Sequence, residues 1–257
     1  MCRRVFIADV CDYWRLSSIF FPSNLKTSRV FQFLLALLGA STGQKGPLWW
    51  AAHHRHHHKH SDTIEDIHSP ALRGIWWAHV GWVLCDKYLT YDKNAVKDFA
   101  RFWELRVLDK FHWIAPAALA VIAYFSGHLL DVHAPQVNIT GLQMLCVGFC
   151  LSTVLVYHAT FSINSLAHLI GRRRFQTTDD SKNSLALALV TLGEGWHNNH
   201  HRYPGSERQG FYWWEVDVTH YTLKVLSWFR VVWDLRKPPR KILEETIILN
   251  ALPKIEP

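Results

Sequence analysis

Histidine is the residue type through which this chain can do chemistry, with 17 among its 257 residues. Six of them form two triads with the same spacing, H-x-x-H-H: His54, His57 and His58, then His197, His200 and His201. On a helix, positions i, i+3 and i+4 share one face, so each triad can direct three imidazoles at one metal ion. A single histidine-rich run could be a weak metal-binding tract or a solvated cationic face, but the recurrence favours a built metal site.

A third segment, Asn164–His168, places an amide and an imidazole one helical turn apart. With the two triads it gives seven imidazoles and one amide without a thiolate, a donor set that suits zinc, iron, copper or nickel. These donors exceed what one ion with about four to six ligands can use, so we expect two metal ions. The spacing does not select iron, although two iron ions would permit oxygen chemistry that zinc cannot perform.

Two uncharged apolar runs, residues 111–130 and 139–163, must hold these clusters in place. Each reaches the roughly 20 residues that a helix needs to cross a bilayer. The short segment between them, residues 131–138, contains Pro135, so we expect a helical hairpin. The predicted fold is therefore an all-α integral membrane protein, a transmembrane hairpin with a cytoplasmic helical cap that carries the His-rich di-metal site; a buried soluble hairpin is the alternative.

Basic residues set the expected orientation of the hairpin. They precede the first run and follow the second, at Arg101, Arg106, Lys110, Arg172, Arg173 and Arg174. By the positive-inside rule both outer ends are cytoplasmic, and because one triad precedes the hairpin and the other follows it, the two can meet there. We therefore expect a multi-pass protein whose active site faces the cytoplasm.

Residues 1–25 have scattered charges, unlike a signal peptide, and form an atypical N-terminal segment. Residues 26–237 form the expected domain, and residues 238–257 a charged, solvated C-terminal tail. Two apolar stretches within the domain, residues 31–40 and 185–192, are too short to span a membrane, so we expect helices packed on the hairpin or lying in the interface. The five cysteines show no paired spacing, which fits a reducing compartment.

At these residues the chain resembles the integral-membrane fatty-acid desaturases of the acyl-CoA Δ9 (stearoyl-CoA desaturase) type, in a bacterial-like form. The resemblance runs from about Lys26 to Lys237. Residues 50–59, 164–168 and 193–204 are similar to the family's second histidine box, its asparagine-containing ligand segment and its third box, in the family's order.

The resemblance implies a centre of two non-haem iron ions that uses O2 to remove two hydrogens from adjacent methylenes of a long acyl chain, giving a cis double bond, expected at Δ9, and water. By position, it assigns seven iron ligands: His54, His57, His58, His168, His197, His200 and His201. Asn164 would hold one iron through a water, and no catalytic residue beyond the metal centre is implied. Trp50 and Thr160 are similar to residues that line the bend of the acyl tunnel, with ordinary packing as the alternative.

The partners implied by the resemblance are a long-chain acyl-CoA or acyl-lipid substrate, the lipid bilayer, and a separate ferredoxin-like or cytochrome-like electron carrier with its reductase. No haem-binding domain is recognisable after Lys237. No nucleic acid is expected, although the net charge is +7. Two other functions remain open: a related di-iron membrane hydroxylase, and a non-catalytic His-rich membrane protein that binds metal.

One feature departs from the family pattern. A first histidine box, H-x-x-x-x-H, should end just before Lys26, preceded by another pair of spans, but Ser17 and Pro22 stand at its histidine positions. A permitted set of codons for residues 17–25, read one base later, gives His-Arg-Tyr-Phe-Ser-His-Arg-Thr, which contains such a box. We therefore expect an N-terminally truncated or frameshifted family member, inactive in this form, and resequencing of the gene would test this.

Overall fold

A computed structural model of the chain describes residues 24–251, with side chains as far as Glu245. Ser17, Pro22 and nearly all of the segment on which the frameshift hypothesis depends lie outside the described residues, so that hypothesis stays a prediction. Within the described part, helices predominate and two short strands, β1 (Lys26–Thr27) and β2 (Val232–Trp233), pair antiparallel. The all-α fold expected from the sequence is confirmed.

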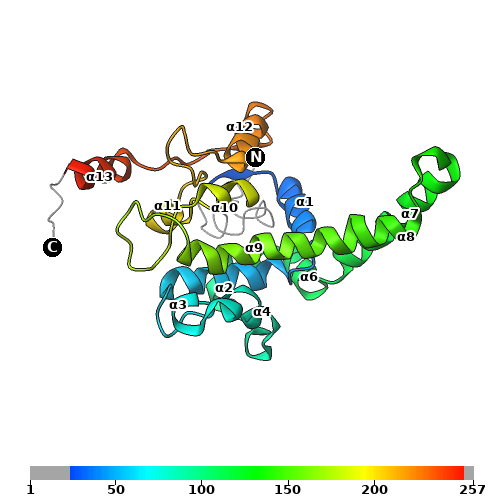
Figure 1. The fold of residues 1–257 in the computed structure, drawn as a ribbon, viewed down its shortest axis with the longest axis horizontal. Helices are drawn as coiled ribbons and strands as arrows, with labels where there is room; N and C mark the ends of the chain where they lie inside the picture. The colour runs from blue at the N-terminus through cyan, green and yellow to red at the C-terminus, as the bar shows by residue number, and fades with distance from the viewer. Residues whose placement is uncertain (1–23, 252–257) are drawn as a thin grey trace.

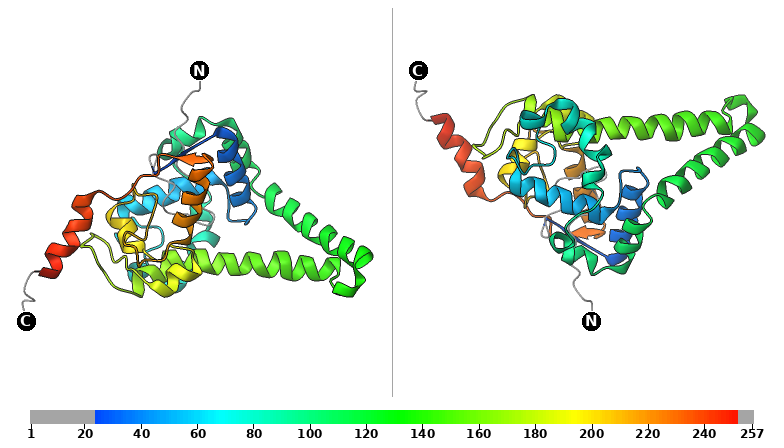
Figure 2. Two further views of the ribbon diagram at one scale, coloured as in Figure 1. Left: turned by 90° about the horizontal axis from the view of Figure 1, so that it is seen from above. Right: turned by 90° about the horizontal axis from the view of Figure 1, so that it is seen from below.

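A long helical hairpin projects from the rest of the molecule (Figure 1, Figure 2). Its first arm is α7 (Ile114–His133), and η4 (Pro135–Val137) forms the turn. The second arm runs without a break through α8 (Gly141–Gln143), η5 (Met144–Leu151) and α9 (Ser152–Leu169). Both arms are long and apolar enough to cross a membrane, and only 11% of the most apolar stretch of each is buried.

The arms differ from the expected runs in where they begin and end. The first begins three residues later than expected, at Ile114. Proline lacks an N–H and is tolerated in the first turn of a helix, which is where Pro116 lies. The second continues past residue 163 to Leu169, because polar residues end a hydrophobic run without ending a helix. That extension carries Asn164 and His168.

The first triad lies on α2 (Pro47–His60). Asp109, in α6 (Trp103–Lys110), accepts hydrogen bonds from the backbone N–H groups of Leu48 and Trp49 at 2.9 and 3.0 Å, which satisfies donors that a helix start leaves open. Gly46 precedes the helix, and a Cβ there would lie 2.6 Å from the Cα of Asp109. The start of α2 is therefore fixed against α6.

Short elements build the rest of this side of the cap, around buried tryptophans. They are α3 (Pro70–Arg73), η1 (Trp77–Gly81), α4 (Trp82–Leu84), η2 (Asp86–Tyr88), η3 (Lys93–Val96) and α5 (Lys97–Ala100). The fully buried Trp82 stacks on Trp49, with ring centroids 5.5 Å apart, and meets Trp50 edge to face. This aromatic packing fixes α2 against the segment that follows it.

The second triad lies on α11 (His197–Arg202), between α10 (Leu185–Val190) and α12 (Val218–Trp228). The chain approaches α10 closely at Gly195, whose carbonyl accepts a hydrogen bond from Ser184 N–H at 2.8 Å. A Cβ on Gly195 would lie 2.6 Å from the Ser184 carbonyl oxygen. Only glycine fits there, and this contact sets where α11 begins.

Both short apolar stretches are helical, as α10 and α1 (Arg29–Ala40), which confirms that expectation. The C-terminal tail differs from a wholly solvated one, because it begins with α13 (Arg240–Ala251). Ile242 is buried in a cluster with Phe175 and Phe211, and Glu245 pairs with Arg202. Apolar packing of Ile242 and Leu243 and an ion pair thus hold the start of the tail against the cap.

Candidate metal centre

The structure gathers the seven histidines into two clusters at the base of the hairpin. In each, the ligand atoms lie within 4.8 Å of one another: His57, His168, His197 and His201 in cluster A, and His54, His58 and His200 in cluster B. Cluster A joins side chains from α2, α9 and α11, and cluster B joins α2 to α11. Helices far apart in the sequence therefore present their histidines to one place.

Within each cluster, ring nitrogens approach one another closely. The Nε2 atoms of His168 and His197 are 3.1 Å apart in cluster A, and those of His58 and His200 are 2.8 Å apart in cluster B. The Nε2 of His201 is buried and has no hydrogen-bond partner among the described residues. Converging ring nitrogens of this kind are what a metal ion requires.

Three aspartates fix which nitrogen faces the cluster. In each case the histidine donates a hydrogen bond from Nδ1: His57 to Asp66 at 3.0 Å, His168 to Asp62 at 2.8 Å, and His201 to Asp179 at 2.7 Å. A neutral imidazole with its proton on Nδ1 carries its lone pair on Nε2. A carboxylate behind each of these histidines therefore leaves Nε2 available to a metal, the arrangement found at metal-ligating histidines.

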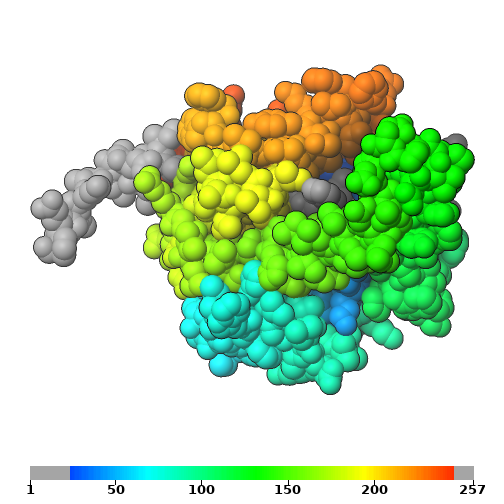
Figure 3. All heavy atoms as spheres, turned by 45° about the vertical axis from the view of Figure 1, so that its right-hand side comes forward, coloured from blue at the N-terminus to red at the C-terminus, as the bar shows by residue number. Residues whose placement is uncertain are grey.

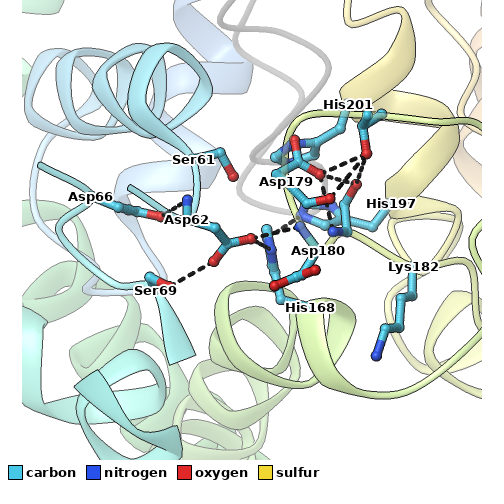
Figure 4. Close-up of polar contacts among 12 residues, drawn as sticks. Ser61, Asp62, Asp66, Ser69, His168, Asp179, Asp180, Lys182, His197 and His201 are labelled. Atoms are coloured by element: carbon cyan, nitrogen blue, oxygen red, sulfur yellow. Dashed lines mark hydrogen bonds and ion pairs between the residues drawn. The ribbon is translucent and has the colours of Figure 1, made fainter. Parts of the chain in front are cut away.

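The aspartates are themselves anchored. Asp62 also accepts hydrogen bonds from the Ser69 hydroxyl at 2.6 Å and from the Asp180 N–H at 2.8 Å (Figure 4). Burial raises the pKa of Asp62, Asp66 and Asp179, but hydrogen bonds and charge from the histidines outweigh it, and all three pKa values lie below the ordinary range. These carboxylates remain ionised at neutral pH.

Burial governs the imidazoles as well. The pKa values of His58 and His197 lie well below 6.5, because burial and neighbouring imidazoles disfavour a positive charge. Burial lowers the pKa of His201 to about 4 despite Asp179. Burial lowers the pKa of His57, but the hydrogen bond and charge of Asp66, together with the charges of Asp62 and Asp179, outweigh it, so its pKa is raised. His58, His197 and His201 are therefore neutral near pH 7, the form that binds metal.

Asn164 and the proposed tunnel residues lie beside the histidine clusters. Asn164 lines a small cavity together with His54 of cluster B and with His57 and His197 of cluster A, and its Nδ2 is buried without a hydrogen-bond partner among the described residues. Trp50 and Thr160 line the same cavity. Gln44 connects Trp50 to Thr160. Its main-chain carbonyl accepts a hydrogen bond from the Trp50 indole, and its side-chain amide donates to the Thr160 hydroxyl at 3.3 Å.

With this geometry described, comparison with known proteins identifies the chain's relatives. The fatty acid desaturase family matches residues 19–227. The chain belongs to this family. It is 35% identical over 220 residues both to an icosanoyl-CoA 5-desaturase of Limnanthes douglasii and to an sn-2 palmitoyl-lipid 9-desaturase of Nostoc sp.. It is also 35% identical over 208 residues to an sn-1 stearoyl-lipid 9-desaturase of Synechocystis sp..

The matches to these desaturases cover most of this chain but a smaller part of the relatives. The match to the Limnanthes protein covers 84% of this chain and 58% of that protein. The match to the Nostoc protein covers 84% of this chain and 71% of that protein. The match to the Synechocystis protein covers 81% of this chain and 61% of that protein. The relatives' names place double bonds at different positions, on acyl-CoA in one and on lipids in the others. Membership of the desaturase family therefore leaves the position and the acyl carrier undetermined.

Other histidines of the first run lie outside both clusters. His53 is buried and donates from Nδ1 to the Trp49 carbonyl at 3.0 Å. His56 donates to the Glu65 carbonyl at 2.9 Å, and His60 contacts the Glu65 carboxylate. The run thus divides by helix face, with the triad on one side and these three residues on others.

An apolar groove of about 590 Å³ runs along α9 and reaches the site. Leu187 and Val190 of α10 line it opposite Leu155 of α9, and it shares Thr160 and Ile163 with the small cavity. In the space-filling view α10, in yellow, lies along the light green α9, with the hairpin extending beyond (Figure 3). The groove offers apolar surface that leads to the histidine clusters.

The sequence analysis missed the three aspartates and Gln44. They lie on segments between helices, so no helical period marks them. The available signal for Asp62 and Asp66 was their position just after the first triad, where metal-site histidines commonly find carboxylate partners.

Proposed function

We propose that this desaturase-family chain introduces a cis double bond, at Δ9, into a long-chain acyl thioester or acyl lipid, using O2 and electrons from outside. The observation that carries the proposal is the pair of histidine clusters whose members His57, His168 and His201 each hold a carboxylate on Nδ1. An apolar groove ends beside these clusters, as a reaction on an acyl chain requires.

Two non-haem iron ions fit this donor set. It consists of imidazoles with no thiolate, and the buried Nε2 of His201 has no hydrogen-bond partner among the described residues. We assign cluster A to one ion and cluster B to the other, with Asn164 holding one of the two ions through a water. Iron bound there would supply the oxygen chemistry that breaks two C–H bonds.

The chain's own residues bind and orient the substrate in this proposal. The groove along α9 removes the acyl chain from water, and the contact of Trp50, Gln44 and Thr160 closes its path beside the clusters. Because the hydrogen bond from Gln44 to Thr160 ties α9 to the segment before α2, it would fix which methylenes lie near the clusters. Trp50 and Thr160 are thus proposed substrate-binding residues.

The proposed setting is a multi-pass membrane protein, with residues 26–237 as the desaturase domain. The two arms of the hairpin would lie in the bilayer with residues 131–138 on the far side, and the clusters would face the cytoplasm. Electrons would come from a separate ferredoxin-like or cytochrome-like carrier and its reductase.

Lipid analysis of a desaturase-deficient host tests the function. The host would express the chain with Ser17→His and Pro22→His, which restores an H-x-x-x-x-H spacing, and the chain as it stands. We expect a new monounsaturated acyl chain, with its double bond at Δ9, from the restored chain and little from the unaltered one. Adding His200→Ala to the restored chain should abolish the product; retention of full activity would refute the di-iron assignment.

A further inference from the structure

Four buried polar atoms without a hydrogen-bond partner among the described residues belong to residues that line one small cavity beside the histidine clusters. Three of them lie outside the clusters: the indole Nε1 of Trp82, Nδ1 of His68 and the amide Nδ2 of Asn164. The fourth is Nδ1 of His197 in cluster A. Trp82 is fully buried, and His68 is 3% exposed. Trp82, His68 and Asn164 come from three separate segments, yet all three line the same small cavity.

The cavity has the size of one water molecule. Its volume is about 10 Å³, and a site needs about 10–15 Å³ to hold a water. Buried polar groups in folded proteins nearly always have a partner, and a buried water commonly supplies about three hydrogen bonds to groups that lack one. The orphaned atoms around this one cavity therefore have a single explanation in common.

Packing prevents these side chains from finding partners elsewhere. The ring of His68 lies between His57 and Trp82, with centroids at 4.2 and 5.0 Å. The His68 N–H donates to Asp66 at 3.1 Å, which holds the backbone as well. Trp82 follows the π-helix η1 and stacks on Trp49. Local departures from the α-helix of this kind are common at functional sites.

We propose that this cavity binds one ordered water held by Trp82, His68 and Asn164, and that Trp82 and His68 are positioning residues of the metal centre. The hydrogen-bonding capacities match. Indole and amide N–H groups donate to the water oxygen, and the water donates to Nδ1 of His68, whose proton then lies on Nε2. The inference rests on the proposed function only where it names a metal centre; the water site itself does not require iron.

The position of this water gives it a role. His54 of cluster B, His57 and His197 of cluster A, and Thr160 all line the same cavity, so the water lies between the metal ligands and the bend proposed for the acyl chain. Trp82 and His68 would set the orientation of the Asn164 amide through the water without touching substrate. Losing either should change how the metal centre holds its metal.

A structure determination with matched variants tests this on the full-length, metal-loaded, detergent-solubilised protein. We expect density for a water within about 2.7–3.2 Å of all three atoms in the parent. Trp82→Phe and His68→Phe keep an aromatic ring and remove the polar atom, so the density should be lost or displaced. An empty cavity in the parent, or unchanged density in both variants, would refute the proposal.

Thermal stability gives a second readout, with Trp49→Phe as the control. Trp49 is also a buried tryptophan, and its Nε1 donates to the Tyr88 carbonyl at 2.7 Å, so its substitution removes a satisfied hydrogen bond and the same volume. If Trp82 holds a water, Trp82→Phe should lower the midpoint of thermal unfolding by as much as Trp49→Phe does. A clearly smaller fall in the midpoint for Trp82→Phe would mean that the Trp82 indole N–H has no partner in the parent, and would contradict the proposal. Neither readout uses double-bond formation, so failure here and failure of the proposed function are distinguishable.

Discussion

Asp62 and His168 are 106 residues apart in the sequence, yet the carboxylate of one accepts a 2.8 Å hydrogen bond from Nδ1 of the other. The side chain of Asp62 is 7% exposed and that of His168 is 1% exposed. The contact joins the loop after α2 to the end of the hairpin's second arm. It therefore positions a cluster A nitrogen and also ties two parts of the molecule together.

Asp62→Asn should weaken metal binding by about 10–100-fold, because the amide loses the charge that makes the His168 imidazole a stronger ligand. Competition titrations of the solubilised protein with a chelator would measure this affinity. Asp92→Asn is the matched control, since Asp92 is exposed and accepts its hydrogen bond from the Asn94 backbone. Equal affinities for the two variants would contradict a role for Asp62 in the metal centre.

The seven ligand histidines should act as a unit. His57→Ala in cluster A and His200→Ala in cluster B should each lower the metal content at least about 10-fold, since an open or misplaced coordination position weakens the site. His53→Ala and His60→Ala should leave it close to that of the parent, because these side chains lie outside both clusters. Elemental analysis of the purified proteins measures all four, and full metal content in His200→Ala would exclude His200 as a ligand.

The helix-borne part of the site was predictable because helical period is a local property. The spacing H-x-x-H-H places three imidazoles on one face of α2 whatever the rest of the chain does. The same holds for Asn164 and His168, although the apolar run ended at residue 163 and left their helix unmarked. The assignment of these residues as iron ligands stays a prediction.

The carboxylates and the small cavity could not be read from the sequence, for a different reason. Asp179 reaches His201 through a loop whose path depends on contacts with α11, where Asn198 accepts hydrogen bonds from the N–H groups of Arg174 and Phe175. Trp82 and His68 meet Asn164 only after three segments have packed together. Such contacts are tertiary, and no spacing within one segment encodes them.

Gly195→Ala should disrupt the site without altering any ligand. The added Cβ would lie 2.6 Å from the Ser184 carbonyl oxygen, so backbone must move, and α11 begins two residues later. We expect a lower thermal midpoint and at least about a 10-fold loss of metal affinity. Gly205→Ala should be mild, since its nearest contact is the Tyr203 side chain at 3.3 Å. A normal metal content in Gly195→Ala would show that α11 tolerates the shift.

The orientation of the hairpin predicts which residues a membrane-impermeant reagent can reach. Lys59 and Arg202 should lie on the cytoplasmic side and residues 131–138 on the other, because basic residues flank both arms. Single cysteines introduced at Lys59, Arg202 and Gln136 would be labelled in intact and inverted vesicles. The background should have all five native cysteines replaced by serine, including Cys146 and Cys150, which are exposed on the hairpin. Opposite labelling of positions 59 and 202 would be incompatible with a shared metal site.

The ion pair between Arg29 and Glu104 gives a prediction about acid. Arg29 donates from Nε and Nη2 to the Glu104 carboxylate at 2.5 and 2.7 Å, which ties α1 to α6. The hydrogen bond from Arg29 outweighs burial and lowers the pKa of Glu104 below its ordinary value of 4.5. A carboxylate whose pKa is lower in the folded than in the unfolded state stabilises the folded protein. This stabilisation is fully present at pH values above the unfolded-state pKa, and it is lost as the pH falls through the folded-state pKa.

Arg29→Gln should therefore lower the thermal midpoint at pH 7 by less than about 4 °C, since Arg29 is half exposed and solvent screens the pair. The difference from the parent should shrink as the pH falls below 4.5, where protonation of Glu104 removes the interaction from the parent as well. Thermal scans of solubilised protein between pH 3 and 7 would follow it. Arg106→Gln, at an exposed position of α6, serves as the control and should show no such pH dependence. A difference between Arg29→Gln and the parent that persists undiminished at pH 3 would mean that Arg29 stabilises through packing and not through Glu104.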